Sequence, residues 1–224
     1  MEAFKSFRLD ILINAAPLLL EGLQNTVQIS CLSFLVALVF GVAVGVARAE
    51  ILWARRILSP YVEVFRGTPL LIQLFFLYYG LPSVGIKMSS GTAAVLGLGL
   101  NGGAYISEIV RGSMASVEKG QLDAARALGF TWLQSMVHVI GPQALRVAVP
   151  PLVNAFSALL KESSLVSVLA ITELTRMSQL IYTRTFRAFE VYLAVGALYF
   201  VLTAVVSAVS RRLEKRYYVG GRMG

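Results

Sequence analysis

A polar insert in an otherwise strongly apolar chain decides the interpretation of this sequence: Asp123-Ala124-Ala125-Arg126-Ala127-Leu128-Gly129, followed after an amphipathic run by Val139-Ile140-Gly141-Pro142. The residues from Glu118 to Leu128 are predicted to form a short helix, which Gly129 would end with a left-handed cap. A chain that is apolar elsewhere would keep such an insert on a membrane surface, where it can meet water or a partner.

The second half of the insert is predicted to be another short helix. Thr131 is a suitable N-cap residue, and the helix would run to about Ile140. Gly141-Pro142 is expected to terminate it, because the residue before a proline disfavours the helical conformation. We call the whole insert, residues 118–142, the knob.

The composition indicates a membrane protein. Of the 224 residues, 57% are hydrophobic and 14% are charged, whereas soluble domains are roughly 45 to 50% apolar and about 25% charged. The formal net charge of +8 does not indicate nucleic acid, because the basic residues are separated by long apolar runs and do not form one face with interleaved aromatic residues. With Cys31 as its one cysteine, the chain cannot form an intrachain disulfide.

A helix needs about 20 mostly apolar residues to cross a bilayer core. Five segments meet this requirement, and we expect them to be the membrane spans: about Gln24–Val46, Ser59–Tyr79, Gly91–Val110, Ala144–Leu160 and Ala188–Val209. The apolar run before the first span is short and is interrupted by Pro17 and Glu21, and it does not resemble a cleavable signal peptide. The stretch Ser164–Leu174 is too short to span and is expected to be re-entrant or external.

Small residues and prolines punctuate these spans. Gly41 and Gly45 are spaced to let another helix approach closely. Pro69 removes an amide donor and is expected to bend or restart the second span. Pro150-Pro151 is expected to interrupt the fourth span in the same way.

The distribution of lysine and arginine predicts the orientation. Basic clusters follow the first span, separate the third from the fourth, and follow the fifth, so all three are cytoplasmic only if the N terminus is outside and the C terminus inside. The segment Lys161–Arg187 would then be external, although its own excess of basic residues runs against this assignment.

Two further sequence features do not indicate a ligand site. Gly97 to Gly102 matches a dinucleotide-binding glycine pattern, but it lies inside a predicted span without a preceding strand, so helix packing is the better interpretation. His138 has no partner ligands at metal-binding spacing, and no metal site is expected. The chain has no phosphate-binding Gly-x-x-x-x-Gly-Lys-Ser/Thr loop, so any nucleotide hydrolysis would belong to another subunit.

The knob resembles a known motif. Asp123-Ala124-Ala125, with Gly129, Val139 and Pro142 at the matching spacing, is similar to the EAA loop of permease subunits in ATP-binding-cassette (ABC) importers. Two positions depart from the family pattern: Asp123 stands where glutamate is usual, and Gly141 where leucine is usual.

Further segments resemble the polar amino acid uptake subfamily, and with the loop they extend the resemblance from Leu18 to Arg216. They are Arg66-Gly67-Thr68-Pro69-Leu70 with Gln73, Asn101 to Glu108, Pro142-Gln143-Ala144, Pro150-Pro151-Leu152-Val153-Asn154, Lys161-Glu162-Ser163-Ser164-Leu165 and Glu173-Leu174-Thr175-Arg176.

The resemblance implies an all-α integral membrane protein with the type I ABC importer (MetI-like) permease fold, and one transmembrane domain over residues 1–224. It implies a multi-pass subunit of the cell (inner) membrane that is not itself an enzyme and holds no cofactor. The implied partners are a second permease copy or a related subunit, two cytoplasmic ATPase subunits that bind ATP and Mg, and a periplasmic or extracellular solute-binding protein. The implied substrate is a polar amino acid, whose identity the motifs do not specify.

Two sets of functional residues are expected. In the knob, small residues would allow close docking to the ATPase and charged residues would contact it: Asp123, Ala124, Ala125, Arg126 and Gly129. Polar residues at membrane depth are costly and are candidates for the substrate path: Gln73, Tyr78, Asn101, Asn154, Glu162 and Ser164. For Gln73, Asn101 and Asn154, an interhelical hydrogen bond is an equal alternative.

For Glu162, the expected partner is a substrate ammonium group or Lys161. The substrate carboxylate would be met by helix N termini or by backbone at the turns near Pro69 and Pro150. Two other classes of protein are alternatives. An ion-coupled secondary transporter would need more spans or an inverted repeat, and a membrane enzyme would need a convergent catalytic set.

Overall fold

The computed structural model describes the backbone of residues 8–218 and the side chains of residues 8–212. The described backbone is helical almost throughout and contains no β-strand, which confirms the all-α class. The elements are α1 (Leu9–Glu50), α2 (Leu52–Gly67), α3 (Leu70–Phe75), the π-helix η2 (Phe76–Gly80), the 3₁₀ helix η3 (Leu81–Val84), α4 (Ser90–Ala115), α5 (Lys119–Ala127), α6 (Trp132–Ser135), the π-helix η4 (Met136–Ile140), α7 (Gly141–Glu162), the 3₁₀ helix η5 (Ser163–Leu169), α8 (Leu174–Thr185) and α9 (Ala188–Tyr218).

The membrane-spanning capacity of the described residues agrees with the expected number of spans. Four helical stretches are long and apolar enough to cross a bilayer, and a fifth span results if α2 and the helices after it count as one bent pair. That pair is bent by 108°. Each of the five predicted spans falls within one of these stretches.

The first helix is longer than expected. α1 has 42 residues and begins at Leu9, with Pro17 inside it, whereas the predicted span begins near Gln24. The early part of α1 is held by apolar contacts, because Ala15 and Leu19 are buried against Leu174 of α8 and Val191 of α9. At about 1.5 Å per residue, α1 is about twice as long as the hydrocarbon core is thick.

Close packing of α1 on α4 forms the centre of the bundle, and glycines make it possible. A Cβ added to Gly41 would lie 2.7 Å from the side chain of Ile106, and one added to Gly45 would lie 2.7 Å from the carbonyl oxygen of Ser107. The predicted role of both glycines in close helix approach is confirmed. From the α4 side, Gly99 and Gly102 lie against α1 in the same way, so the glycine pattern of this span serves helix packing.

The second span is sharply bent where Pro69 was expected to break it. Thr68 and Pro69 both have extended backbone conformations between α2 and α3. The carbonyl oxygens that the break leaves free find side-chain amides: Gln73 donates to the carbonyl oxygens of Phe65 (2.9 Å) and Thr68 (3.1 Å), and Asn101 of α4 also donates to that of Phe65 (3.0 Å). The carbonyl oxygens of Phe65 and Thr68 therefore remain hydrogen-bonded at the bend.

The expectation that Gly141-Pro142 ends the second helix of the knob is wrong. The chain stays helical from α6 through the π turn of η4 into α7. A Cβ on Gly141 would lie 2.5 Å from the carbonyl oxygen of Met136, so the wide turn requires glycine here. Pro142 then occupies the first turn of α7, where a missing N–H costs little.

Pro150-Pro151 does not interrupt the fourth span either, because α7 continues through both prolines to Glu162. The segment that follows, expected to be re-entrant or external, forms the short helix η5 and turns at Ala170, which has a φ of 58°. Glu173 then caps α8, accepting hydrogen bonds from the amides of Thr175 (2.8 Å) and Arg176 (2.7 Å).

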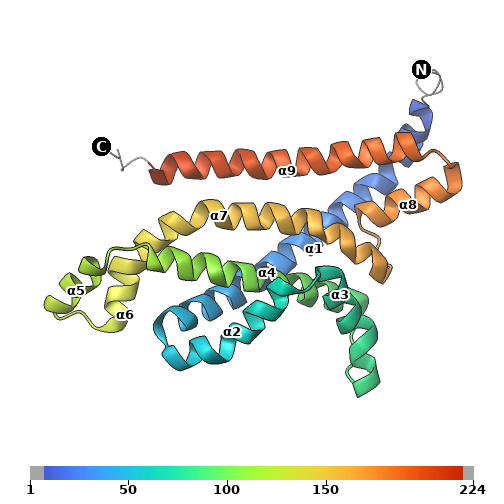
Figure 1. The fold of residues 1–224 in the computed structure, drawn as a ribbon. Coiled ribbons are helices and arrows are strands. Elements are labelled where there is room, and N and C mark those ends of the chain that lie inside the picture. Colours follow the sequence, from blue (N-terminus) through green and yellow to red (C-terminus); the bar gives the residue numbers. More distant parts are fainter. Residues whose placement is uncertain (1–7, 219–224) are drawn as a thin grey trace.

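The two ends of the molecule differ (Figure 1). One end carries α5, α6, the turn between α1 and α2, and the C-terminal end of α9. The opposite end carries the start of α1, α8 and the start of α9. The described chain thus begins and ends at opposite ends of the bundle, as an odd number of spans requires.

Candidate transport site

The connection between the two helices of the knob is ordered by caps. Gly129 has a φ of +79°, and the amides of Gly129 and Phe130 donate to the carbonyl oxygens of Arg126 (3.0 Å) and Ala125 (3.1 Å). This is the left-handed cap predicted for Gly129. Thr131 and Gln134 form a reciprocal capping box at the start of α6, so the predicted N-cap is also confirmed.

Four of the five predicted coupling residues are exposed on the knob. Asp123, Ala124, Arg126 and Gly129 are solvent-exposed, whereas Ala125 is 3% exposed and packs inside the knob. Asp123 and Arg126 are 4.0 Å apart and both largely exposed, so the pair contributes little to stability and both charges are accessible. The small size of Ala125 therefore serves the internal packing of the knob in this subunit.

The knob also carries an exposed apolar surface that the sequence analysis did not single out. Leu128 is 77% exposed, Leu133 63%, Val137 57% and Trp132 50%. Exposed apolar patches of this kind mark contact sites for other proteins or for lipid. The spacing of Leu133 and Val137, four residues apart on one helical face, is the signal that could have revealed it.

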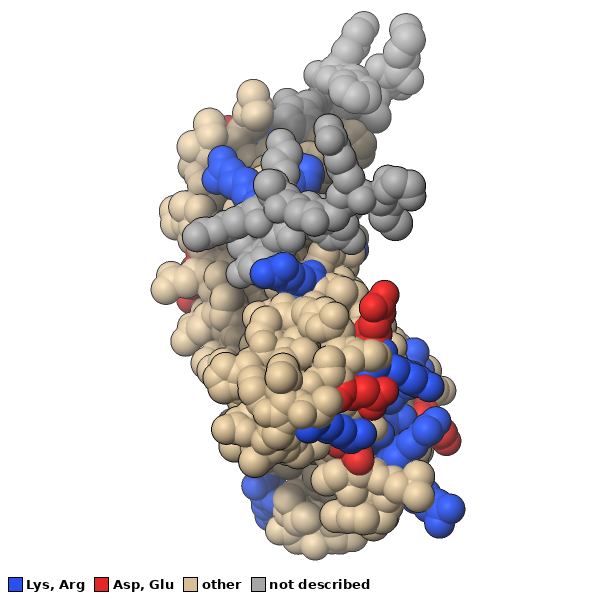
Figure 2. Space-filling view, turned by 90° about the vertical axis from the view of Figure 1, so that its left-hand side faces the viewer, with Lys and Arg blue, Asp and Glu red and all other residues tan. Residues whose placement is uncertain are grey.

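A side-chain contact ties the knob to the first helix. The indole Nε1 of Trp132 donates a hydrogen bond to the Oε2 of Glu50 over 2.9 Å, which joins the start of α6 to the end of α1. Figure 2 looks onto this end of the molecule, where lysine and arginine side chains lie beside aspartate and glutamate side chains. His138, on the exposed face of η4, has its Nδ1 3.1 Å from the carbonyl oxygen of Gln134, to which an Nδ1–H donates.

The knob is continuous with the fourth span. The helical stretch from Trp132 to Leu169 runs continuously through α6, η4, α7 and η5. Because Asn154 and Glu162 lie on α7, the same stretch holds two of the predicted substrate-path residues.

A cavity of about 430 Å³ lies between α1, α2, α4 and α7. It contains three of the six predicted substrate-path residues, Asn101, Asn154 and Glu162. The cavity is lined by Phe34, Arg66, Asn101, Gly102, Tyr105, Ile106, Glu108, Ile109, Pro151, Asn154, Ala155, Ala158, Leu159 and Glu162.

The other three predicted residues lie outside this cavity. Gln73 stabilises the bend between α2 and α3, and its Oε1 accepts a hydrogen bond from Asn101 over 3.1 Å. Tyr78 packs beside a core cluster around Leu74, and its ring meets that of Tyr79 edge to face. Ser164 lies in η5, beyond the cavity residues of α7. Asn101 has two roles, because it both lines the cavity and holds the bend.

Three polar side chains of the cavity, those of Arg66, Tyr105 and Glu108, were not among the predicted site residues. The guanidinium of Arg66 lies 5.3 Å from the ring centroid of Tyr105 and 4.0 Å from Glu108. Asn101, Tyr105 and Glu108 follow one another at i, i+4 and i+7 along α4, which places them on one face. This spacing was present in the sequence, but only folding brings Arg66 of α2 to it.

Glu162 and Glu108, the two carboxylates of the cavity, differ in their ion pairing. Among the described residues no ion pair involves Glu162, and the expected alternative partner Lys161 does not form one with it. Glu108, by contrast, is paired with Arg48 (2.5 Å) and Arg111 (2.8 Å). No cluster of three or more metal-ligating side chains occurs in the part of the chain that the structure describes.

A helical bundle with up to five candidate spans, a cavity lined in part by charged and amide side chains, and a capped knob continuous with one span are the features of a membrane transport subunit. Residues 37–218 match the family described as binding-protein-dependent transport system inner membrane component, and the chain belongs to this family. It is therefore a multi-pass inner membrane permease subunit of an ABC importer, and the alternative of an ion-coupled secondary transporter is not favoured.

The chain is similar to named transport proteins over nearly its whole length. The glutamine transport system permease protein GlnP of Escherichia coli (strain K12) is 41% identical over 205 residues, which cover 90% of this chain and 94% of GlnP. The L-cystine transport system permease protein TcyB of Bacillus subtilis (strain 168) is 36% identical, covering 89% of this chain and 86% of TcyB.

Solved structures confirm the predicted importer permease fold. The crystal structure of an amino acid ABC transporter with histidines matches with a TM-score of 0.87 and 36% identity, covering 94% of this chain and 99% of that one. An inward-facing MetNI methionine ABC transporter matches with a TM-score of 0.77, covering 89% and 96% of the two chains; at 22% identity this likeness concerns the fold alone.

Proposed function

We propose that this subunit forms the translocation path of an importer for polar amino acids, powered by separate ATPase subunits. The single observation that carries the substrate class is the cavity that presents Arg66 and Glu162 together. An amino acid is a zwitterion, so it offers a carboxylate and an ammonium group to a cavity that holds Arg66 and Glu162, while the second carboxylate of the cavity, Glu108, is already paired with Arg48 and Arg111. The names of relatives that transport glutamine and cystine support the same class.

In the proposed site the substrate ammonium meets Glu162 and the substrate carboxylate meets Arg66, whose planar guanidinium suits a carboxylate. The amides of Asn101 and Asn154 are available for polar groups of the side chain. A carboxylate site at a helix N terminus near Pro150 is not proposed, because α7 is continuous there. Three of the predicted path residues are ranked below these, because they lie outside the cavity: Gln73, Tyr78 and Ser164.

For coupling, we propose that the exposed Asp123, Ala124, Arg126 and Gly129, with the apolar surface around Leu133, dock on an ATPase subunit. Such a subunit would hold ATP and Mg, and its closure would move the knob. The continuous helix from Trp132 to Leu169 supports this role, because it connects the second half of the knob to Asn154 and Glu162. The chain itself would carry no cofactor.

The proposed assembly has two permease subunits, either two copies of this chain or this chain with a related one, two ATPase subunits and an external solute-binding protein. The N terminus is proposed to be outside and the C terminus cytoplasmic. The basic residues at the knob end of the molecule support this orientation. A cysteine placed at Gln121 should react with an impermeant maleimide only in opened cells, and one placed at Ser83 also in intact cells; the reverse pattern would contradict the orientation.

The substrate site is tested by Glu162→Gln in the importer reconstituted with its ATPase and solute-binding protein. Loss of one charged contact is expected to lower ATP-dependent amino acid uptake by at least tenfold, since hydrogen bonds to charged groups contribute about 1.5 to 3 kcal/mol. The matched control is Lys161→Gln, because Lys161 is the neighbouring residue and does not line the cavity. Equal uptake by both variants would remove Glu162 from the site, and uptake driven by an ion gradient without ATP would overturn the proposed function.

A further inference from the structure

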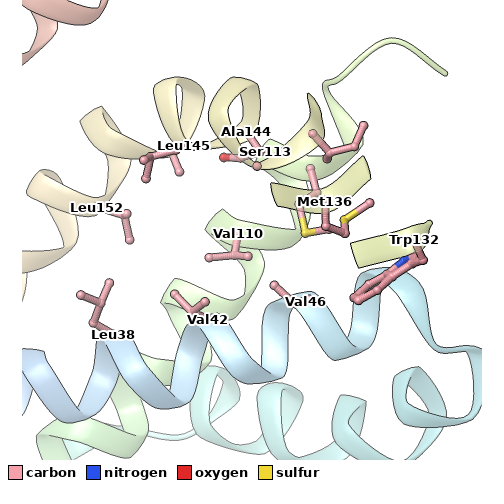
Figure 3. A pocket seen from close by; sticks show the side chains of 14 residues that line it. Leu38, Val42, Val46, Val110, Ser113, Trp132, Met136, Ala144, Leu145 and Leu152 are labelled. Carbon is pink, nitrogen blue, oxygen red and sulfur yellow. The ribbon is translucent and has the colours of Figure 1, made fainter. Parts of the chain in front are cut away.

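Two cavities of opposite character meet beneath the knob. One is polar, encloses about 170 Å³ and is lined by Arg48, Ala49, Glu50, Arg55, Arg111, Met114 and Ala115. The other is apolar and encloses about 400 Å³. Figure 3 shows Leu38, Val42 and Val46 of α1 on one side of the apolar cavity and Ala144, Leu145 and Leu152 of α7 on the other, with Trp132 at one end.

The two cavities adjoin. Met114 lines both of them. Val46 of the apolar cavity and Glu50 of the polar cavity are four residues apart, so they lie on one face of α1. Trp132, which lines the apolar cavity, donates its indole N–H to Glu50. A single molecule with a polar head and an apolar tail could therefore occupy both.

The polar cavity carries an excess of positive charge. Its lining residues include three arginines and one carboxylate, that of Glu50. Arg48 and Arg111 share Glu108 as a partner, whereas no described residue forms an ion pair with Arg55. The three arginines together thus exceed Glu50 and Glu108 by one positive charge.

Arg48 has unused hydrogen-bonding capacity. Its side chain is 8% exposed, and its terminal nitrogens donate to Glu108 and to the hydroxyl of Ser59 (3.2 Å). Its Nε, however, is buried and has no hydrogen-bond partner among the described residues. A buried donor without an acceptor destabilises the folded state. An anion in the adjoining cavity would lower this cost, because it places negative charge beside the guanidinium of Arg48.

The surface next to the polar cavity has the character of a membrane interface. The first turns of α2 expose Leu52 (71%), Trp53 (66%) and Ile57 (66%) beside Arg55. Tryptophan and arginine are typical of the level of lipid headgroups, and anionic lipids attract basic segments at this level.

We propose that these joined cavities bind an anionic phospholipid, with its phosphate at Arg48, Arg55 and Arg111 and an acyl chain in the apolar cavity between α1 and α7. Phosphate oxygens match the arginine forks, and the acyl chain covers apolar side chains such as Leu145, which is 53% exposed. Free inorganic phosphate has the same head chemistry, but it would leave the apolar cavity unoccupied. The lipid would bridge α1, α4 and α7 beside the knob, and this binding does not depend on which substrate is transported.

The test counts retained lipids by native mass spectrometry. The full chain, purified with its associated subunits, is incorporated into vesicles of equal phosphatidylglycerol and phosphatidylcholine and then extracted in mild detergent. We expect phosphatidylglycerol to be retained in preference to phosphatidylcholine, and Arg55→Gln to reduce that retention about fivefold, the effect of one basic side chain near an anionic lipid. Arg55 is used because it is exposed and unpaired, so its replacement leaves the Arg48–Glu108 pair intact.

The matched control is Arg56→Gln, which removes the same charge from the neighbouring position without touching the cavity lining. Equal losses in both arginine variants would reduce the effect to general surface attraction and overturn the site. Val46→Trp, which fills the apolar cavity and keeps every arginine, should also lower retention; unchanged retention would overturn the acyl-chain assignment. Binding of inorganic phosphate without any preferential retention of phosphatidylglycerol would show a free-phosphate site instead.

Discussion

Two glycine–proline sites in this chain have similar sequences and opposite structures. At Gly67-Thr68-Pro69 the helix ends and the next one leaves at 108°, whereas at Gly141-Pro142 the helix continues through a π turn into α7. Proline lacks an amide donor in both places. The two sites differ in the groups that lie near the carbonyl oxygens to which proline cannot donate.

At the first site, side-chain amides from Gln73 and Asn101 take up the carbonyl oxygens that the break leaves free. At the second, Gly141 allows the carbonyl of Met136 to come close, and the wider turn accommodates Pro142 at the start of the next helix. The first site therefore shapes the bundle next to the cavity, and the second makes a continuous helical connection between the knob and the cavity. Proline alone predicts neither outcome.

The largest effect is expected from Gly141→Leu, which places a branched side chain at the π turn. The new side chain would meet a backbone carbonyl at 2.5 Å, so the π turn would have to rearrange at a cost of about 3 kcal/mol, the upper part of the range for overpacking. The free energy of unfolding in SDS measures this cost, and the ATPase activity coupled to transport measures its effect on the knob. Gly120→Ala, a helical glycine with no neighbour within 4 Å of the added Cβ, is the control and should be neutral or slightly stabilising. A stable, fully coupled Gly141→Leu variant would show that the turn needs no glycine.

A smaller effect is expected from Asn101→Leu, which removes two hydrogen bonds at the bend. At about 1 kcal/mol for each, the free energy of unfolding should fall by about 2 kcal/mol. Asn154→Leu is the matched control, because Asn154 lines the same cavity but is exposed and does not hold the bend. Equal losses of stability in the two variants would contradict the role of Asn101 in the bend.

The smallest change in stability is expected at Gly129, where a third glycine does end a helix. Gly129→Val should cost about 1 to 2 kcal/mol, because a side chain is strained in the left-handed conformation, and it should reduce the coupling of ATP hydrolysis to uptake. Gly129→Asn, which tolerates that conformation, should retain more coupling. An equal loss in both variants would point to added bulk at the docking surface, since no atom of the described residues lies within 4 Å of the new Cβ.

The sequence predicted the local features well where the cause was local. The left-handed cap at Gly129 and the capping box at Thr131 depend on residues within one or two turns, and both formed as expected. Long apolar runs likewise located the spans. Helix ends were less predictable: α1 begins before Pro17 because α8 and α9 pack against its early turns, and those contacts are more than 150 residues distant in sequence, as between Leu19 and Leu174.

The candidate site was predicted in part. Asn101, Asn154 and Glu162 were chosen because polar groups are rare in spans, and they meet in one cavity. Gln73 was chosen for the same reason and stabilises the bend instead. Arg66 was missed as a site residue, because its distance from Glu108 depends on how α2 returns along α4.

By itself, the sequence determined the class of the protein, its helical spans and the capped knob, because apolar length, cap chemistry and the spacing of the loop motif act over short stretches of chain. Only the tertiary structure decided which prolines break a helix and which polar side chains share a cavity. It also decided that the second half of the knob and Glu162 belong to one continuous helical stretch. These outcomes depend on whether a free carbonyl or a charge finds a partner on another helix, and that partner is supplied by folding.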